Sequence, residues 1–316
     1  MMPSRIAVCL NTFRRPTQLR KTLEAIGTLK FDRKPAPQIN VVIVNNDSTS
    51  GIEPLLDELR PGYPWPLHGL REPRRGIPQA RNRAVRHAQS LGVDYCAFLD
   101  DDEYPDPDWL ARLMSCSERK HAPIVQGQVI PQFMAEAPAW MVEGRFFHGG
   151  RDLPALNSGH TLCSGATNNL LVRSDVFTSM GLFDEWWATQ GGDDTEFTLR
   201  AARFGFMIVW CPEAIVHEWI PSGRMTVRWI LTRGFRAGNT RGLIGARQSN
   251  NLSSRLLLLA ASLLLVTRSS AQLACGCLAK KSKRLNLLQE FIFSIGTFSG
   301  IFGFKFLEYE RPYVEV

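Results

Sequence analysis

The stretch YCAFLDDDE, residues 95–103, decides the fold that this sequence predicts. Its first five residues are a short apolar run that indicates a β-strand. Four acidic residues follow without a break: Asp100, Asp101, Asp102 and Glu103. In open α/β sheets, ligands bind beyond the carboxyl ends of the strands, so we expect these carboxylates to project into a binding crevice.

Adjacent carboxylates of this kind repel one another and raise one another's pKa unless a cation neutralises them. A hard divalent ion with oxygen ligands, Mg²⁺ or Mn²⁺, is the natural partner, and it would also hold a substrate diphosphate. A solvated acidic turn, or a cap for a helix beginning in residues 105–113, is the alternative interpretation.

The sequence around this stretch alternates short apolar runs with segments of helical spacing, which predicts an α/β fold with a mostly parallel sheet. Helix-like segments cover residues 16–29, the stretch around GIPQARNRA (76–84), and residues 194–204. Further strands are expected at residues 6–10, 41–44, 124–130 and 206–210.

A second acidic cluster lies in GGDDTEF, residues 191–197, at the start of the last of these helices. The two glycines allow the backbone to bend sharply and a ligand to approach closely. A carboxylate fixed at such a turn, Asp194, is a candidate general base for activating a hydroxyl. Helix capping is the alternative for Asp194 and for Glu196.

The order of these motifs resembles family 2 of the glycosyltransferases, which have the nucleotide-sugar-binding fold called GT-A. The resemblance covers about residues 5–220. Its elements, in chain order, are NTFRRP (11–16), NNDST (45–49), GIPQARNRA (76–84), FLDDDEYP (98–105), SGATNNLLVRSDVF (164–177), GLFDEWW (181–187), GGDDTEFTLRAARFG (191–205) and IVHEW (215–219).

The resemblance implies a donor site and a metal site. Asn46 stands where the family usually has an aspartate that binds uracil, which leaves the base of the donor open because an amide can donate or accept. The implied metal ligands are Asp102, Asp100 and His217, for Mg²⁺ or Mn²⁺, with a structural role as the alternative for His217. The implied donor-binding residues are Thr12, Arg14, Asn46, Asp47, Gly76, Arg81, Asp100 and Asp101.

The same resemblance implies that Asp194 is the catalytic base of an inverting reaction. It would deprotonate the acceptor hydroxyl as that oxygen attacks the anomeric carbon from the face opposite the diphosphate. The candidate acceptor-binding residues are Trp186, Trp187, Asp193 and Glu196. The tryptophans could stack on a sugar face, and packing in the core is the alternative for at least one of them.

Residues 221–316 form a tail that differs in kind from the rest of the chain. The tail holds 14 of the 37 Lys and Arg residues but only 4 of the 30 Asp and Glu residues, so the basic excess of the chain, formally +7, belongs to it. Two apolar runs, residues 256–266 and 291–304, fall short of a spanning helix, and KKSKR (280–284) lies between them. We expect interfacial or re-entrant helices at an anionic membrane surface, with buried helices of a small accessory domain as the alternative.

The tail sequence GTFSGIFGFKFLEYERP, residues 296–312, is also similar to bacterial exopolysaccharide transferases of the succinoglycan-assembly type. The full expectation is therefore a catalytic domain over residues 1–220 that moves a hexose, glucose from UDP-glucose, onto a lipid-linked oligosaccharide. The alternatives are a sugar-nucleotide pyrophosphorylase and a non-enzymatic basic protein that binds membrane or nucleic acid. NTFRRP lacks the glycines of a pyrophosphorylase loop, and the Leu-rich and Phe-rich tail favours lipid over nucleic acid as a partner.

The N-terminus lacks the apolar stretch of a secretory signal, and the seven cysteines are scattered without CxxC spacing. We therefore expect a cytoplasmic protein with reduced cysteines, peripherally associated with the inner face of the plasma membrane.

Overall fold

The computed structural model describes residues 3–32, 35–49, 51–147, 156–249, 251–276 and 278–307. Its contacts divide the chain into two compact units. The sheet unit comprises Met1–Gln132, His148–Ala188 and Asp193–Trp219. The helical unit comprises Phe133–Phe147, Thr189–Gly192 and Ile220–Val316. Whether residues 1–220 and 221–316 fold as separate domains stays a prediction.

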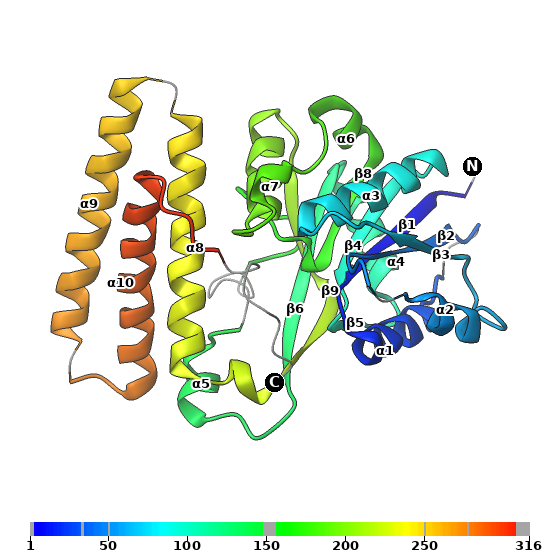
Figure 1. Cartoon of the computed structure of the whole chain (residues 1–316), viewed down its shortest axis with the longest axis horizontal. Helices are drawn as coiled ribbons and strands as arrows, with labels where there is room; N and C mark the ends of the chain where they lie inside the picture. Colours follow the sequence, from blue (N-terminus) through cyan, green and yellow to red (C-terminus); the bar gives the residue numbers. More distant parts are fainter. Residues whose placement is uncertain are drawn as a thin grey trace. The chain divides into compact units, whose positions relative to one another are not determined.

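The sheet unit is built on a mixed β-sheet whose order is β3-β2-β1-β4-β8-β6-β9-β5, with β7 paired to β9 (Figure 1). Its parallel half consists of β1 (Arg5–Thr12), β2 (Gln38–Asn45), β3 (Leu67–Arg71) and β4 (Tyr95–Asp100). The other half consists of β5 (Glu103–Pro105), β6 (Ile124–Phe133), β7 (Thr161–Leu162), β8 (Leu170–Arg173) and β9 (Ile208–Ile220). Strand β8 pairs antiparallel with β4 and β6, and β5 and β7 pair antiparallel with β9. The α/β prediction is confirmed.

Alternate residues of β1 divide between two hydrophobic cores, one on each face of the sheet. Val8 and Leu10 pack in one core with Leu23 and Trp109, whereas Cys9 packs in the other. The first core is covered by α1 (Pro16–Gly27), α2 (Glu53–Leu59) and α4 (Trp109–Lys120). The second is covered by α3 (Ile77–Ser90), α6 (Ser174–Met180) and α7 (Asp193–Arg203).

Helix α3 forms as the sequence predicts, because its alanine stripe is small enough to lie close to the sheet. Ala80, Ala84 and Ala88 are all fully buried. Gly76 precedes the helix with φ of 146°, and a Cβ there would meet the Cβ of Ala188 at 2.8 Å. A residue with a side chain would be strained at this position, so the expected turn at Gly76 is confirmed.

The helical unit contains α5 (Ala139–Gly144), α8 (Val227–Gln248), α9 (Leu252–Cys275) and α10 (Lys281–Ile301), with α10 between α8 and α9 (Figure 1). The apolar run at 256–266 is only the middle of α9, because flanking Ser, Thr and Arg residues extend the helix. At 24 residues and a mean hydropathy of 1.6 over its most apolar part, α9 passes the length and composition test for a membrane span. The structure therefore extends this helix well beyond the apolar run on which the expectation of a short segment rested. Short 3-10 turns occur at Thr167–Asn169, Glu185–Trp187 and Ser222–Arg224.

Candidate active site

The candidate site lies at the carboxyl ends of β1, β2 and β4, where the parallel strands end side by side. Strand register places Thr12 opposite Asn45, and Asn11 opposite Asp100. The polar segments after β1, β2 and β4 therefore meet at one edge of the sheet, as the sequence predicts for ligand binding in such a fold.

The acidic turn after β4 is held by residues that follow β1. Thr12 Oγ1 donates a hydrogen bond to Asp101 Oδ2 at 2.7 Å. Arg15 Nη1 contacts both Asp101 Oδ1 at 3.0 Å and Asp102 Oδ2 at 3.1 Å. Asp101 is buried by these contacts, whereas the Asp100 side chain remains 46% exposed. Asp101 is thus an internal anchor of the turn, and Asp100 is the open carboxylate.

The carboxyl groups of this turn are electrostatically crowded. Desolvation, with repulsion from Asp102 and Asp101, raises the pKa of Asp100 to about 7 against the attraction of Arg81. Desolvation raises the pKa of Asp101 to about 6, opposed by Arg15 and Thr12. Burial also raises the pKa of Glu103, whose Oε2 accepts a hydrogen bond from the Asp100 backbone N–H at 2.8 Å. A cation at this turn would relieve the repulsion.

Arg81 connects the acidic turn to the second acidic cluster. This buried guanidinium pairs with Asp193 Oδ2 at 2.5 Å, and its Nη2 lies 3.9 Å from Asp100 Oδ1. The charges of Asp193, Asp194 and Asp100 outweigh burial and raise the pKa of Arg81. The two clusters, separated by about ninety residues in the sequence, therefore share one cationic neighbour.

Asp194 lies in the first turn of α7, immediately after a sharp bend. Gly191 and Gly192 have φ of 72° and 96°, conformations that favour glycine. Asp194 Oδ1 accepts hydrogen bonds from the Thr195 backbone N–H at 2.6 Å and the Thr195 hydroxyl at 3.2 Å. Among the described residues, Oδ2 accepts no hydrogen bond. This oxygen can take a proton from a bound hydroxyl.

The acidic turn suits a divalent cation that takes some of its oxygen ligands from the substrate. No group of three His, Cys, Asp or Glu side chains in the described ranges is arranged as a complete metal cage. Magnesium sites often use only one or two carboxylates with substrate phosphates and water. Asp100 and Asp102 supply two carboxylates, and the exposed surface of Asp100 leaves room for such oxygens.

His217 does not present a free nitrogen to this turn, which corrects its assignment as a metal ligand. Its Nδ1 lies 3.1 Å from Gln132 Nε2, and its Nε2 lies 2.9 Å from Asp106 Oδ1. Its ring also stacks on Tyr104, with centroids 4.8 Å apart. Metal binding would require His217 to give up one of these hydrogen bonds, so the structural alternative describes it better.

The side chains of Asn46 and Asp47, two of the implied donor-binding residues, bind to other residues of the protein. The Asn46 amide donates to the backbone carbonyls of Glu72 and Arg74 at 2.9 and 2.8 Å, and its Oδ1 accepts from the Gly76 N–H at 2.8 Å. Asn46 therefore fixes the loop before α3. Asp47 pairs with Arg14, whose Nε lies 2.8 Å from Oδ2.

Three of the four candidate acceptor residues are packed inside the sheet unit. Asp193 is buried against Arg81, and Trp187 is fully buried, so the core-packing alternative holds for Trp187. Glu196 pairs with Arg200 one turn along α7, with Oε1 2.9 Å from Nε. Trp186 and Glu196 are both only partly buried, so Trp186 is the aromatic candidate that keeps surface for an acceptor sugar.

Arg15 contacts the acidic turn, and Asn82, beside Arg81, fixes the backbone at Phe183; the sequence singles out neither residue. Arg15 lies in NTFRRP beside Arg14, and nothing in the pattern tells which arginine faces the acidic turn. Asn82 Nδ2 donates to the Phe183 carbonyl at 2.9 Å, and its Oδ1 accepts from the Phe183 N–H at 2.9 Å. The triplet ARN at 80–82 offers the only signal for Asn82, because it also contains Arg81.

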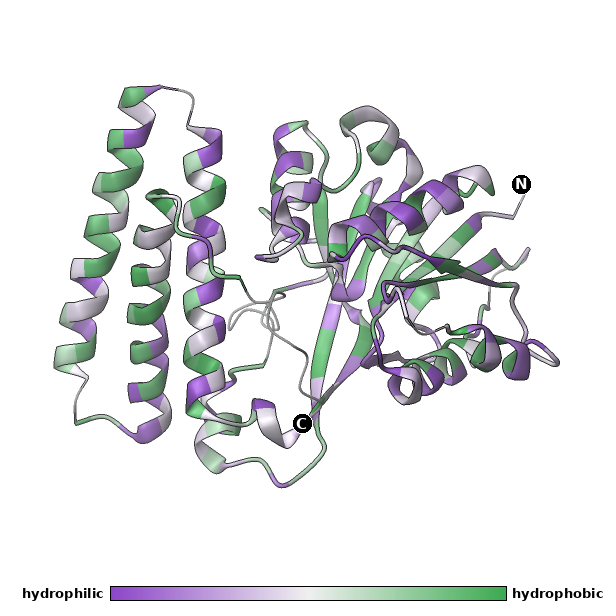
Figure 2. Ribbon diagram, in the orientation of Figure 1, coloured by the Kyte–Doolittle hydropathy of each residue, from purple (hydrophilic) through white to green (hydrophobic). Residues whose placement is uncertain are grey.

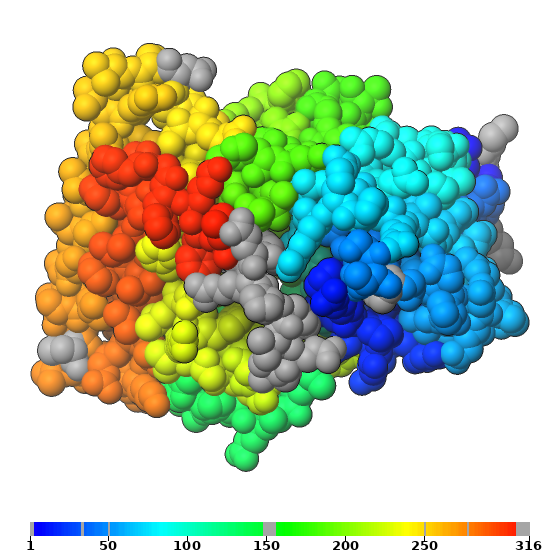
Figure 3. All heavy atoms as spheres, viewed as in Figure 1, coloured from blue at the N-terminus to red at the C-terminus, as the bar shows by residue number. Residues whose placement is uncertain are grey.

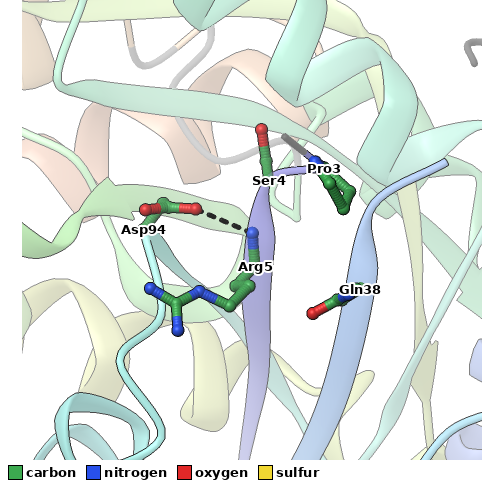
Figure 4. A pocket seen from close by; sticks show the side chains of 5 residues that line it. All are labelled: Pro3, Ser4, Arg5, Gln38 and Asp94. Carbon is green, nitrogen blue, oxygen red and sulfur yellow. Dashed lines mark hydrogen bonds between the residues drawn. The ribbon is translucent and has the colours of Figure 1, made fainter. Parts of the chain in front are cut away.

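A separate hollow lies at the opposite end of the parallel strands. It is lined by Pro3, Ser4, Arg5, Gln38 and Asp94, and the Arg5 backbone N–H donates to Asp94 Oδ2 at 2.8 Å (Figure 4). These residues belong to the starts of β1 and β2 and to the turn before β4. This hollow is therefore not part of the site at the carboxyl ends.

Comparison with known proteins agrees with this geometry. The sequence model of "Glycosyl transferase family 2" matches residues 7–178, more than half of the chain, and that of "Glycosyl transferase family group 2" matches residues 95–283. The chain belongs to glycosyltransferase family 2. The transferase is 31% identical over 307 residues to the succinoglycan biosynthesis protein ExoM of Rhizobium meliloti, covering 96% of this chain and 94% of ExoM.

A more distant sequence relative and a solved structure also resemble this chain. The transferase is 22% identical over 242 residues to a glucosyl-dolichyl phosphate glucuronosyltransferase of Haloferax volcanii, covering 74% of each chain. Its fold resembles the mannosyltransferase PcManGT of Pyrobaculum calidifontis, solved in complex with GDP-Man and Mn²⁺. That likeness has a TM-score of 0.63 at 17% identity and covers 96% of this chain and 88% of PcManGT. The GT-A fold predicted from the motifs is thereby confirmed.

Proposed function

We propose that the transferase moves a hexose, glucose from UDP-glucose, onto a hydroxyl of a lipid-linked oligosaccharide with inversion at the anomeric carbon. The observation that carries this proposal is the pair of acidic clusters around Arg81. One cluster offers an open carboxylate at Asp100, and the other offers a free oxygen at Asp194. Asp100 and Asp194 both interact with the Arg81 guanidinium, which supports a metal-assisted donor site beside a base for the acceptor.

On the donor side, Asp100 and Asp102 would hold a divalent cation, Mg²⁺ or Mn²⁺. When bound, the cation supplies positive charge to the diphosphate that leaves. Arg15 fixes the Asp102 carboxylate at 3.1 Å, which keeps the turn in one conformation before the donor arrives. The structure of PcManGT with GDP-Man and Mn²⁺ supports this arrangement by analogy of fold.

On the acceptor side, Asp194 Oδ2 would accept the proton of the attacking hydroxyl. The new bond forms between that oxygen and the anomeric carbon as the bond to the diphosphate oxygen breaks, and the nucleoside diphosphate departs with the electron pair. Attack opposite the leaving group turns an α-linked donor into a β-linked product. Arg81 lies beside both acidic clusters and would keep the Asp100 and Asp194 carboxylates in position during this step.

The acceptor class and the location are supported by the named relatives and by the tail. ExoM is a succinoglycan biosynthesis protein, and the glucuronosyltransferase acts on glucosyl-dolichyl phosphate by its name. Helix α9 is apolar, and the tail is rich in Lys and Arg. We infer that the enzyme works in the cytoplasm at the inner face of the plasma membrane, with which its tail associates.

The test is a panel of nucleotide sugars measured with Mn²⁺ and with Mg²⁺. Because a ligand that binds only the native state raises its stability, UDP-glucose with a cation should raise the melting temperature more than GDP-mannose or the nucleotide alone. The product made on a polyprenyl-diphosphate-linked oligosaccharide should carry a β-linkage by NMR. An α-linked product, or stabilisation by a different sugar nucleotide only, would refute the corresponding part of the proposal.

A further inference from the structure

The burial pattern of helix α9 is the reverse of that of a helix in a water-soluble protein. Its buried positions are Ser262 and Ser269, whereas Leu256, Leu257, Leu263 and Leu264 lie on the outside. These four leucines are 51–73% exposed. Soluble helices bury leucine and expose serine, because apolar surface in contact with water is unfavourable. The exposed face of α9 is therefore apolar, and Figure 2 shows how many residues along this helix are hydrophobic.

The exposed leucines form one continuous face rather than scattered residues. Leu256 and Leu263, like Leu257 and Leu264, are seven positions apart, which places each pair on the same side of the helix. Figure 3 shows α9 as the outer column of the helical unit, in gold to orange. Leu252, near the start of the helix and 72% exposed, extends this apolar face toward the N-terminal end.

Small and polar residues, rather than leucines, also lie at the contacts between the other helices of the helical unit. Ser269 Oγ and Ser294 Oγ form a buried hydrogen bond of 2.8 Å between α9 and α10. Between α8 and α10, a Cβ on Gly238 would meet the Phe293 carbonyl, and a Cβ on Gly242 would meet that of Thr297. Small and polar residues therefore make these helix contacts, which leaves the leucines of α9 outside them.

Charge around α9 favours an anionic lipid surface over a protein partner. Lys280, Lys281, Lys283 and Arg284 are exposed in the segment that follows α9. Glu290 is the only acidic residue of the sequence between Arg224 and Lys305. Arg255 and Arg268 interrupt α9, so its uncharged part has twelve residues, 256–267, and spans only about 18 Å at 1.5 Å per residue. That length fits a helix lying along the bilayer surface better than one crossing about 30 Å of hydrocarbon.

We propose that α9 lies in the plane of an anionic bilayer, with the face formed by Leu256, Leu257, Leu263 and Leu264 among the acyl chains. The basic segment 280–284 contacts the lipid headgroups beside it. This inference deepens the proposed membrane association by naming the element that inserts, and it rests on that association but not on the sugar that is transferred.

Flotation of the full-length protein with vesicles of phosphatidylcholine and phosphatidylglycerol tests the proposal. The wild type should float with these vesicles and stay bound through a high-salt wash, because buried leucines are not screened by ions. Leu257→Lys with Leu264→Lys should lower the bound fraction at least tenfold. The two added positive charges attract anionic lipid, so a loss can only reflect the lost apolar contact.

The matched control is Phe204→Lys with Met207→Lys, which places two lysines at exposed apolar positions of the sheet unit. This control should float like the wild type. Thermal stabilisation by UDP-glucose with Mn²⁺, measured on the same samples, reports the donor site separately. Lost flotation with intact donor stabilisation supports the proposal, whereas an absent donor response in the wild type would count against the proposed function alone.

Three outcomes would overturn the proposal. Release of the wild type by high salt would mean that the contact is only electrostatic. Unchanged flotation of the double lysine variant would mean that the leucine face does not touch lipid. A dimer in lipid-free sedimentation that the variant dissociates, with vesicle binding unchanged, would assign this face to a second copy of the chain.

Discussion

The proposed catalytic base, Asp194, is held by its immediate neighbours. Thr195 holds one carboxylate oxygen, so the side chain is fixed while the second oxygen stays open. The preceding glycines permit the bend that brings this carboxylate to the start of α7. The charge of Arg81 also acts on this carboxylate.

We expect Asp194→Asn to reduce turnover by about 10²–10⁴-fold, because an amide cannot accept the acceptor proton. Its shape is unchanged, so the dissociation constant for UDP-glucose with Mn²⁺ should stay within a few-fold of the wild type. Single-turnover transfer and donor titration on the same preparation separate the two effects. Retained turnover with weakened donor binding would contradict the role of Asp194 as the base.

Asn46 supports a second prediction at this scale. In Asn46→Asp, a carboxylate would face the Glu72 and Arg74 carbonyls to which the amide now donates. Loss of these bonds should lower the free energy of unfolding by about 2 kcal/mol and weaken donor binding, because the loop before α3 is released. Thermal unfolding and donor titration measure both effects. Asn157→Asp, at an exposed position, is the matched control and should change neither. Tighter UDP-glucose binding by Asn46→Asp would show instead that this position contacts the base.

At the scale of elements, α8 and α10 depend on glycines that let their backbones touch. Gly238 and Gly242 on α8 face α10, and Gly296 and Gly300 on α10 face α8. The Asn239 amide between them donates to Ser299 Oγ at 3.1 Å and to the Phe304 carbonyl at 2.8 Å. Such close contact makes the helix pair sensitive to a single added methyl group.

Gly238→Ala should destabilise the protein by about 1–3 kcal/mol, because the new Cβ would press on the Phe293 carbonyl of α10. The backbone cannot move aside as a side chain can. Gly245→Ala in the same helix is the control, since its Cβ would meet only the Leu258 side chain at 3.0 Å. Denaturant unfolding should show a loss for Gly238→Ala and little change for Gly245→Ala. Equal stability of the two variants would mean that α8 and α10 do not pack this closely.

At the scale of the whole molecule, charge is divided between an acidic catalytic part and a basic tail. The catalytic part concentrates carboxylates at one turn, where desolvation raises the pKa of Asp100 to about 7 and that of Asp101 to about 6. In the unfolded chain an aspartate has a pKa of about 3.9. The native state of the cation-free protein therefore holds protons that the unfolded chain has already lost between about pH 4 and pH 7.

Because the native state binds more protons in this window, the free energy of unfolding without cation should fall as the pH rises from about 4 to about 7. A cation requires deprotonated ligands, so Mn²⁺ should raise the melting temperature more at pH 8 than at pH 5.5. Asp100→Asn with Asp102→Asn is the matched variant and should lose most of the Mn²⁺ response. The same Mn²⁺ shift at both pH values would place the cation elsewhere.

The sequence by itself determined the fold class and the position of the acidic clusters. Apolar runs bounded by polar turns fix where strands such as β4 end, and parallel strands bring those ends together. The ordered motifs from NTFRRP to IVHEW were specific enough to predict the family. These are local signals, and each can be read within a short stretch of chain.

The tertiary structure alone decided which neighbouring residues face the site. Arg14 and Arg15 are adjacent in sequence, yet only Arg15 contacts the Asp101 and Asp102 carboxylates. The same holds for α9, because the sequence left both a membrane-surface helix and a buried helix open, and only the structure shows that its leucines are exposed. Side-chain direction and burial depend on packing between distant segments, and a linear pattern does not contain that information.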